Sequence, residues 1–164
     1  MIRAATSEDA KRISQIYNHY VTNSVITFEE IVVSDNDIAD RMKTIQNSGL
    51  PWLVEELEGR VVGYAYATPW RNRSAYRFTV ESAVYVDHLS QGSGTGSRLY
   101  AELFAQLLQR GFHSVMGMIA LPNPDSIKLH QRLGFTQVGL HKEVGWKANR
   151  WIDVGVWQLS LGKC

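Results

Sequence analysis

The sequence has little of what marks a secreted, membrane-spanning or nucleic-acid-binding chain. Its single cysteine, Cys164, leaves no intramolecular disulfide, so we expect a reducing compartment and place the protein in the cytoplasm. No apolar run approaches the roughly 18 to 20 residues of a membrane helix, and residues 1–9 lack an apolar leader. With 17 Lys and Arg against 16 Asp and Glu, the charge of +1 argues against nucleic-acid and membrane partners.

What is present fits one globular domain over residues 1–164. The 164 residues (18.5 kDa) are 45% hydrophobic and 20% charged, which is enough to bury a core without long disordered tracts. The five histidines show no two-His-plus-acid spacing, so we expect no metal site. Cys164 has no positioned histidine in the sequence and is a poor nucleophile candidate, which favours direct transfer over a covalent enzyme intermediate.

Hydrophobic periodicity predicts an α/β fold, a mixed sheet with helices on its faces. The expected helices cover residues 7–21, a segment opening at Ser34, the segment after the glycines at 92–96, and 124–133. The expected strands cover residues 52–57, 61–67, 75–86, 114–121, 135–140 and 152–161. In the strand 75–86, even positions are apolar and odd positions polar or small, so one face packs and the other meets solvent or a cleft.

A glycine-rich turn, Gln91-Gly92-Ser93-Gly94-Thr95-Gly96, joins a strand to a helix. Such a turn presents free backbone N–H groups at the positive end of the helix dipole, which is how proteins hold pyrophosphate. No Gly-Lys-Ser/Thr follows, so it is not a nucleotide-binding loop of that kind, and the dinucleotide spacing is absent. Taken alone, an ordinary tight turn before a helix explains the segment nearly as well.

The turn gains meaning from its context. Together with Asn123-x-x-Ser126-x-x-Leu129-His130-x-x-x-Gly134-Phe135 it resembles the acyl-CoA grip of the GNAT superfamily of N-acetyltransferases. Over almost the whole chain the sequence resembles the phosphinothricin and methionine-derivative N-acetyltransferases of that superfamily. The segments carrying this closer likeness are 16–21, 27–28, 51–54, 63–67, 79–86, 121–123, 126–130, 145–147 and 151–154.

The resemblance implies acetyl-CoA as cosubstrate and a sheet splayed at its centre, so that the thioester lies between two parallel strands. It implies main-chain pairing of the pantetheine arm with one strand, pyrophosphate binding by the loop and helix start, and contacts from a later helix. The residues concerned are Val84, Tyr85 and Val86, then Gly92, Ser93, Gly94, Thr95, Gly96 and Ser97, then Asn123 and Ser126. Asn123 also has a simpler interpretation, as the N-cap of its helix.

Two residues are candidates for proton transfer. An amine must be neutral to attack a thioester, so some base must remove a proton, directly or through water. The resemblance places that base at Glu81, which lies on the polar face of the strand expected to carry the cofactor; otherwise Glu81 is a solvated strand carboxylate. His130 occupies the position where many N-acetyltransferases protonate the departing thiolate with a tyrosine. It also fits a substrate contact or a packed helix residue.

The acceptor is expected to meet the arginine-rich connection before the Glu81 strand. Guanidinium groups grip carboxylate or phosphinate oxygens in a two-pronged geometry. The candidate acceptor residues are Phe28, Arg71, Arg73, Ser74, Ala75 and Tyr76. A solvated surface loop is the alternative, strongest for Arg71 and Arg77, and Phe28 also fits an ordinary core position.

Three functions follow for the chain. The first is acetylation of the α-amino group of phosphinothricin, methionine sulfoximine or methionine sulfone by direct amine attack. The second is acetylation of another small amine or a protein N-terminus, and the third is a non-catalytic acyl-CoA sensor.

The resemblance also implies a homodimer. Trp146, Trp151 and Trp157 are expected to be packing residues, and no chemical role is assigned to Lys147.

Overall fold

The computed structural model describes residues 1–162; Cys164 lies outside them. These residues form a seven-stranded sheet with helices on both faces. The strands are β1 (Ile2–Ala4), β2 (Trp52–Leu57), β3 (Arg60–Pro69), β4 (Thr79–Val86), β5 (Ser114–Ala120), β6 (Thr136–Lys147) and β7 (Arg150–Ser160). The helices are α1 (Ala10–Asn23), α2 (Asp35–Asn47), α3 (Thr95–Gln109) and α4 (Pro124–Arg132).

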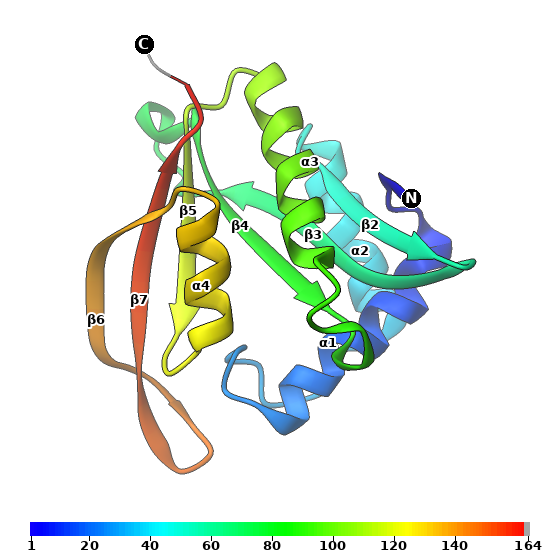
Figure 1. Cartoon of the computed structure of the whole chain (residues 1–164), viewed down its shortest axis with the longest axis horizontal. Helices are drawn as coiled ribbons and strands as arrows, with labels where there is room; N and C mark the ends of the chain where they lie inside the picture. Colours follow the sequence, from blue (N-terminus) through cyan, green and yellow to red (C-terminus); the bar gives the residue numbers. More distant parts are fainter. Residues whose placement is uncertain (163–164) are drawn as a thin grey trace.

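The strand order in the sheet is β1-β2-β3-β4-β5-β7-β6. Only β4 and β5 pair in parallel among the described strands; the other neighbours are antiparallel. Figure 1 shows β4 and β5 in the middle of the sheet and the long β6–β7 hairpin at one edge. The predicted mixed α/β architecture is therefore confirmed.

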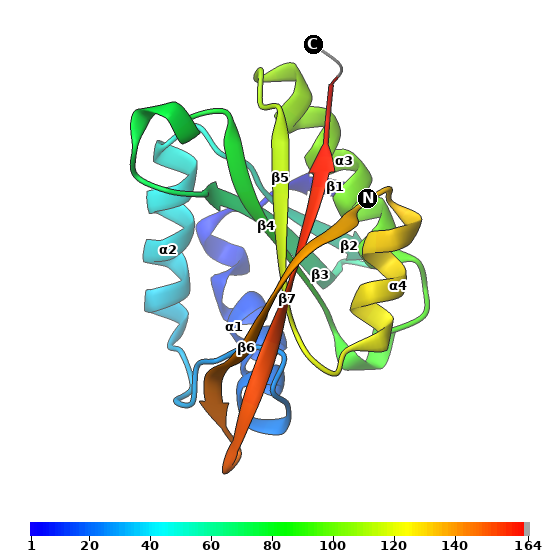
Figure 2. The same cartoon turned by 90° about the vertical axis from the view of Figure 1, so that its left-hand side faces the viewer.

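The helices form two layers around the sheet. Figure 2 shows α1 and α2 on one side of the strands and α3 and α4 on the other. The α1/α2 side buries a cluster that includes Ile13, Ile16 and Tyr64. The α3/α4 side buries a second cluster that includes Leu103 and Val115. Strands β2 and β3 supply residues to both clusters, because successive side chains point to opposite faces of the sheet.

The expected strand 75–86 begins later than predicted. Residues Ser74–Tyr76 form a single 3-10 turn, and the N–H of Arg77 donates to the carbonyl of Ser74 at 3.1 Å. Regular pairing with β3 starts only where Val80 meets Pro69. The alternation of apolar residues over 76–80 was misleading because nothing in the sheet pairs with the first of them.

The last two strands are longer than predicted. A bulge lies between His141 and Gly145, where Glu143 takes a positive φ of 50°, and pairing with β7 resumes at Gly145. Ala148 and Asn149, with φ of 51° and 56°, then close the hairpin. The irregular stretch breaks the period-2 pattern, so the sequence prediction ended the strand at residue 140. Among residues 1–162, no helix is both long and apolar enough to cross a membrane.

Candidate active site

Strands β4 and β5 separate partway along their length. Their parallel pairing runs from Thr79 with Ser114 to Glu81 with Met116 and stops there. Past Glu81, β4 continues to Val86 with β3 as its only described neighbour. Figure 1 shows the two strands diverging into a V below this point. The expected splay is present, and it leaves one main-chain edge of β4 available to a ligand.

The expected pantetheine residues lie on this open part of β4. Val84, Tyr85 and Val86 are all half-buried. Their other edge is fixed, because Val84 pairs with Ala65 and Val86 with Gly63 of β3. An extended ligand arm can therefore take the place that β5 has vacated, as an added strand does at a sheet edge.

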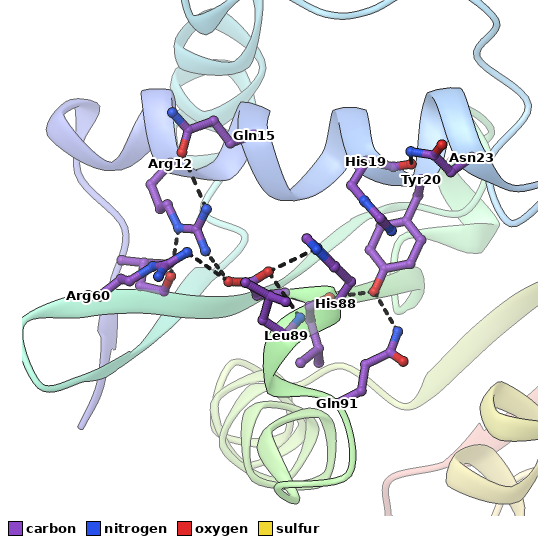
Figure 3. Close-up of polar contacts among 12 residues, drawn as sticks. Arg12, Gln15, His19, Tyr20, Asn23, Arg60, His88, Leu89 and Gln91 are labelled. Atoms are coloured by element: carbon purple, nitrogen blue, oxygen red, sulfur yellow. Dashed lines mark hydrogen bonds and ion pairs between the residues drawn. The ribbon is translucent and has the colours of Figure 1, made fainter.

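The chain leaving β4 is anchored to α1, as Figure 3 shows. Arg12 and Arg60 both donate to the buried carboxylate of Asp87, Arg60 at 3.2 Å. Further along, the Gln91 side-chain amide donates to the Tyr20 hydroxyl at 3.1 Å, and that hydroxyl bonds the carbonyl at the end of β4. These contacts fix both sides of the turn that enters the glycine-rich loop.

The loop itself has the geometry of an anion site. Gly92 and Gly94 take positive φ values of 76° and 80°, which only glycine adopts without strain. Gly94 is the N-cap of α3 and has no side chain to satisfy the first amides of the helix. The Thr95 side chain points inward and packs on Gly63, where a Cβ would lie 2.8 Å from Thr95 Cγ2. Thr95 therefore offers its amide alone, and its side chain fixes the start of the helix.

Helix α4 brings three expected residues to the splay. Asn123 caps the helix, since its Oδ1 accepts from the Ser126 amide at 3.2 Å. The capping interpretation of Asn123 is thus correct, and any cofactor contact is left to Nδ2. His130 is buried, with Nδ1 bonded to the Ser126 carbonyl at 2.8 Å. Its Nε2 lies against β5, 2.8 Å from where a Cβ would stand on Gly117.

These contacts define the protonation state of His130. A carbonyl only accepts, so Nδ1 carries the hydrogen and Nε2 presents a lone pair. Burial lowers the pKa of His130, which keeps the ring neutral. The imidazole also meets Tyr100 and Phe135 edge-on, at centroid distances of 5.5 and 4.8 Å. Of the three roles considered for His130, the geometry favours the packed one.

Glu81 lies at the last paired position before the strands part. It stands opposite Thr68 on β3, so it shares the α1/α2 face of the sheet with that residue. Burial raises the pKa of the Glu81 carboxyl, and no hydrogen bond or ion pair to it is found within residues 1–162. A half-buried carboxylate without a cation partner binds a proton more readily than an exposed one.

A cleft of about 500 Å³ opens on the same face, between α2 and strands β2 and β3. Thr68, the partner of Glu81, lies in its wall. The other lining residues are Tyr17, Asp37, Ile38, Asp40, Arg41, Thr44, Ile45, Trp52, Tyr64 and Tyr66. The sequence analysis missed Tyr17 and Tyr66; the Tyr-x-Tyr alternation in β3 placed two rings on one face but gave no sign that the face borders a cleft.

The expected acceptor residues of the β3–β4 connection are gathered at the surface. A recess of about 630 Å³ is lined by Trp70, Arg71, Asn72, Arg73 and Tyr76. Ser74 and Ala75 are exposed in the adjoining turn. The Arg71 guanidinium lies over the Trp70 ring, 5.1 Å from its centroid. No carboxylate within residues 1–162 pairs with Arg71 or Arg73, so both are available to an anionic ligand.

Phe28, the residue expected to form the apolar wall of the acceptor site, contacts a residue that lies far away in the sequence. Its ring lies directly on Gly145 of β6, and 43% of it remains exposed. Two predictions about the neighbouring tryptophans are wrong: Trp146 and Trp151 are 51% and 59% exposed, and they face each other rather than a core. Trp157 alone is buried as expected.

The chain belongs to the GNAT acetyltransferase family. The family model described as an acetyltransferase (GNAT) domain matches residues 2–156. The splayed sheet and the glycine-rich helix start agree with that assignment, and the protein is an acyltransferase that uses acetyl-CoA.

Comparison with individual relatives shows which members of the family the chain is similar to. The chain is 43% identical over 157 residues to a phosphinothricin N-acetyltransferase of Streptomyces viridochromogenes, covering 96% of this chain and 85% of that one. It is 36% identical over 160 residues to the L-methionine sulfoximine/L-methionine sulfone acetyltransferase of Salmonella typhimurium, covering 98% and 94%. A crystal structure of a phosphinothricin acetyltransferase from Sinorhizobium meliloti in complex with acetyl-CoA superposes with a TM-score of 0.95 at 40% identity, covering 99% and 88%.

Proposed function

We propose that this protein transfers the acetyl group of acetyl-CoA to the α-amino group of phosphinothricin or a related amino acid such as methionine sulfoximine or methionine sulfone. The observation that carries the proposal is Glu81, a half-buried carboxylate with a raised pKa at the point where β4 and β5 part. The names of the relatives support this acceptor class. The free arginines of the β3–β4 connection support it independently.

The cofactor side is assigned to main-chain groups. The free edge of β4 at Val84–Val86 would pair with the pantetheine arm, and the amides from Gly92 to Ser97 would hold the pyrophosphate. Asn123 and Ser126 would contact the arm from α4. When bound, acetyl-CoA supplies a thioester carbon that an amine can attack. Amides of β4 that point into the splay would stabilise negative charge developing on the carbonyl oxygen.

Glu81 is assigned the role of general base. The acceptor amine arrives mostly protonated at neutral pH, so a proton must leave before it can attack. Glu81 takes that proton directly or through one water, and its raised pKa brings it closer to the range in which a carboxylate serves as a base. We assign no proton transfer to His130, because Nδ1–H is committed to the Ser126 carbonyl and Nε2 carries no proton to give.

The acceptor's negative end is assigned to the β3–β4 connection. Arg73 and Arg71 present guanidinium groups without carboxylate partners in the described chain, which suits a carboxylate or phosphinate. Tyr76 lies in the same recess, next to Ser74 and Ala75. Phe28 would bound the site on its apolar side.

The direct test is acetyl-CoA-dependent thiol release with a panel of acceptors. Phosphinothricin, methionine sulfoximine and methionine sulfone are compared with ordinary amino acids and a short peptide. We expect the three tetrahedral phosphorus or sulfur compounds to give the highest kcat/KM. Preference for the peptide would favour protein N-termini as substrates, and thermal stabilisation by acetyl-CoA without any release would favour the sensor role.

We further propose that the protein is a cytoplasmic homodimer. The edge strand β6 and its neighbour β7 expose apolar side chains from Val138 to Trp151, and an exposed apolar sheet edge of this length is rare on a monomer. Two copies can cover the same hairpin by two-fold symmetry. Sedimentation should give the mass of two chains, and Trp151→Arg should shift it toward one. The single cysteine in the sequence agrees with a reducing compartment.

A further inference from the structure

A buried lysine joins the β6–β7 hairpin to the connection between α1 and α2. Lys147, the last residue of β6, is only 7% exposed, and its Nζ donates to the Thr27 carbonyl at 2.7 Å. Lysine is rarely this buried without a reason, because withdrawing an ammonium group from water is unfavourable. The bond spans 120 residues of sequence and ties together two segments that lie far apart along the chain.

The same two segments meet a second time, beside the lysine. The Phe28 ring lies so close to Gly145 that a Cβ there would stand 2.4 Å from Cε2 and Cζ of the ring. Gly145 is thus a position where the absence of a side chain lets the phenyl ring rest on the strand. Lys147 and Gly145 lie two residues apart on β6 and point to the same face of the strand.

The connection is also tied inward, toward β4. The Thr27 hydroxyl and the Tyr17 hydroxyl share a buried hydrogen bond of 2.6 Å. The Tyr17 ring meets Tyr85 edge-on at a centroid distance of 5.1 Å, and Tyr17 lines the cleft beneath α2. Two residues after Thr27, Glu29 pairs at 2.6 Å with Arg41, which lies in the wall of that cleft. A displacement of residue 27 would therefore move residues on both sides of the cleft.

We propose that Lys147 is a positioning residue for the acceptor: its bond to Thr27 holds Phe28 on Gly145 as the apolar wall of the acceptor site. The proposal rests on the proposed function for its choice of acceptor. The Nζ of Lys147 has one hydrogen-bond partner in residues 1–162, the Thr27 carbonyl, and makes no hydrogen bond to the loop that would hold the cofactor. Loss of the lysine should therefore weaken acceptor binding and leave acetyl-CoA binding intact.

Steady-state kinetics separate this role from a merely structural one. We expect Lys147→Met to raise KM for methionine sulfone about tenfold, the size of one lost bond to a charged donor, with kcat and the KM for acetyl-CoA nearly unchanged. Lys147→Arg should restore part of the loss. Lys142→Met is the matched control, because Lys142 lies on the same strand, is exposed and pairs with Asp153 at 3.2 Å. Equal effects of the two Met variants, or a fall in kcat alone, would overturn the proposal.

Two further measurements test the positioning role independently of the Lys147→Met kinetics. Phe28→Ala keeps the lysine bond and removes the wall, so it should give the same rise in acceptor KM, and the double variant should be no worse than either single one. Amide hydrogen exchange over residues 24–33 needs no acceptor: exchange should be faster in Lys147→Met than in Lys142→Met. Equal exchange refutes the positioning role, whereas inactivity of the wild-type protein on every acceptor refutes only the proposed function.

Discussion

The two halves of the candidate site are built in different ways. The proposed cofactor half uses the edge of β4 and the start of α3, which follow one another within residues 82–97, and the groups assigned to the ligand are mostly backbone amides. The proposed acceptor half is assigned to side chains on three separate segments, the α1–α2 connection, the β3–β4 connection and the β6–β7 hairpin. Backbone groups are the same for every residue type, so the first half suits a shared cosubstrate. Side chains on separate connections can change independently, so the second half suits a specific acceptor.

The largest effect should come from the residue between the two halves. Glu81→Gln keeps the size of the side chain and removes its ability to take a proton. We expect kcat to fall by about 10²- to 10⁴-fold, the usual contribution of a general base. KM for acetyl-CoA should stay near the wild-type value, because the cofactor half is made of main chain. Thiol-release kinetics check both numbers, and an unchanged kcat would remove Glu81 from this role.

The difference between the halves also explains what the sequence could predict. The glycine turn, the Asn123 cap and the strand carrying Glu81 lie in contiguous motifs, and the structure places all of them around the splay. The acceptor half depends on contacts such as Phe28 on Gly145, which join residues more than one hundred positions apart. No local periodicity encodes such a contact, and the apolar alternation around Tyr76 predicted a strand where a turn is found.

A substitution that displaces the backbone near the cofactor half should weaken the binding of acetyl-CoA. In Gly63→Ala the new Cβ would lie 2.8 Å from Thr95 Cγ2 and 3.1 Å from the Tyr85 carbonyl oxygen, so α3 or β4 must shift. Overpacking of this kind costs about 1–3 kcal/mol, and Tm should fall by roughly 2–4 °C per kcal/mol. KM for acetyl-CoA should rise while KM for the acceptor changes little.

Gly139→Ala is the control for that variant, because its Cβ would lie 3.6 Å from Val156, an ordinary contact distance. Calorimetry and steady-state kinetics on both variants give the comparison. If Gly63→Ala instead raised KM for the acceptor alone, the assignment of the two halves would have to be exchanged.

Removal of a side chain from the acceptor half should weaken the binding of the acceptor. Arg73→Ala removes one guanidinium from the recess before β4, and we expect KM for phosphinothricin to rise roughly tenfold, as for one lost charge-assisted bond. Arg77→Ala is the matched control: its guanidinium lies 4.5 Å from the Phe78 ring centroid and donates to the Ser74 carbonyl. Similar changes in both variants would indicate general electrostatic attraction, which added salt would then abolish.

The smallest expected effect is a pH-dependent change in stability when Glu81 is replaced. Burial raises the pKa of this carboxyl in the folded state, so the folded protein binds the proton more tightly than the unfolded chain. Stability is therefore lost as pH rises from the ordinary glutamate range through the folded-state pKa, and the full penalty is present at neutral pH. Gln carries no such penalty. Glu81→Gln should melt slightly above the wild type at pH 7, and most of the gain should disappear by pH 4, where the carboxyl is largely protonated in both states of the wild type. Melting curves at the two pH values decide it: a gain that persisted at pH 4 would mean that repacking, and not the charge needed for catalysis, sets the difference.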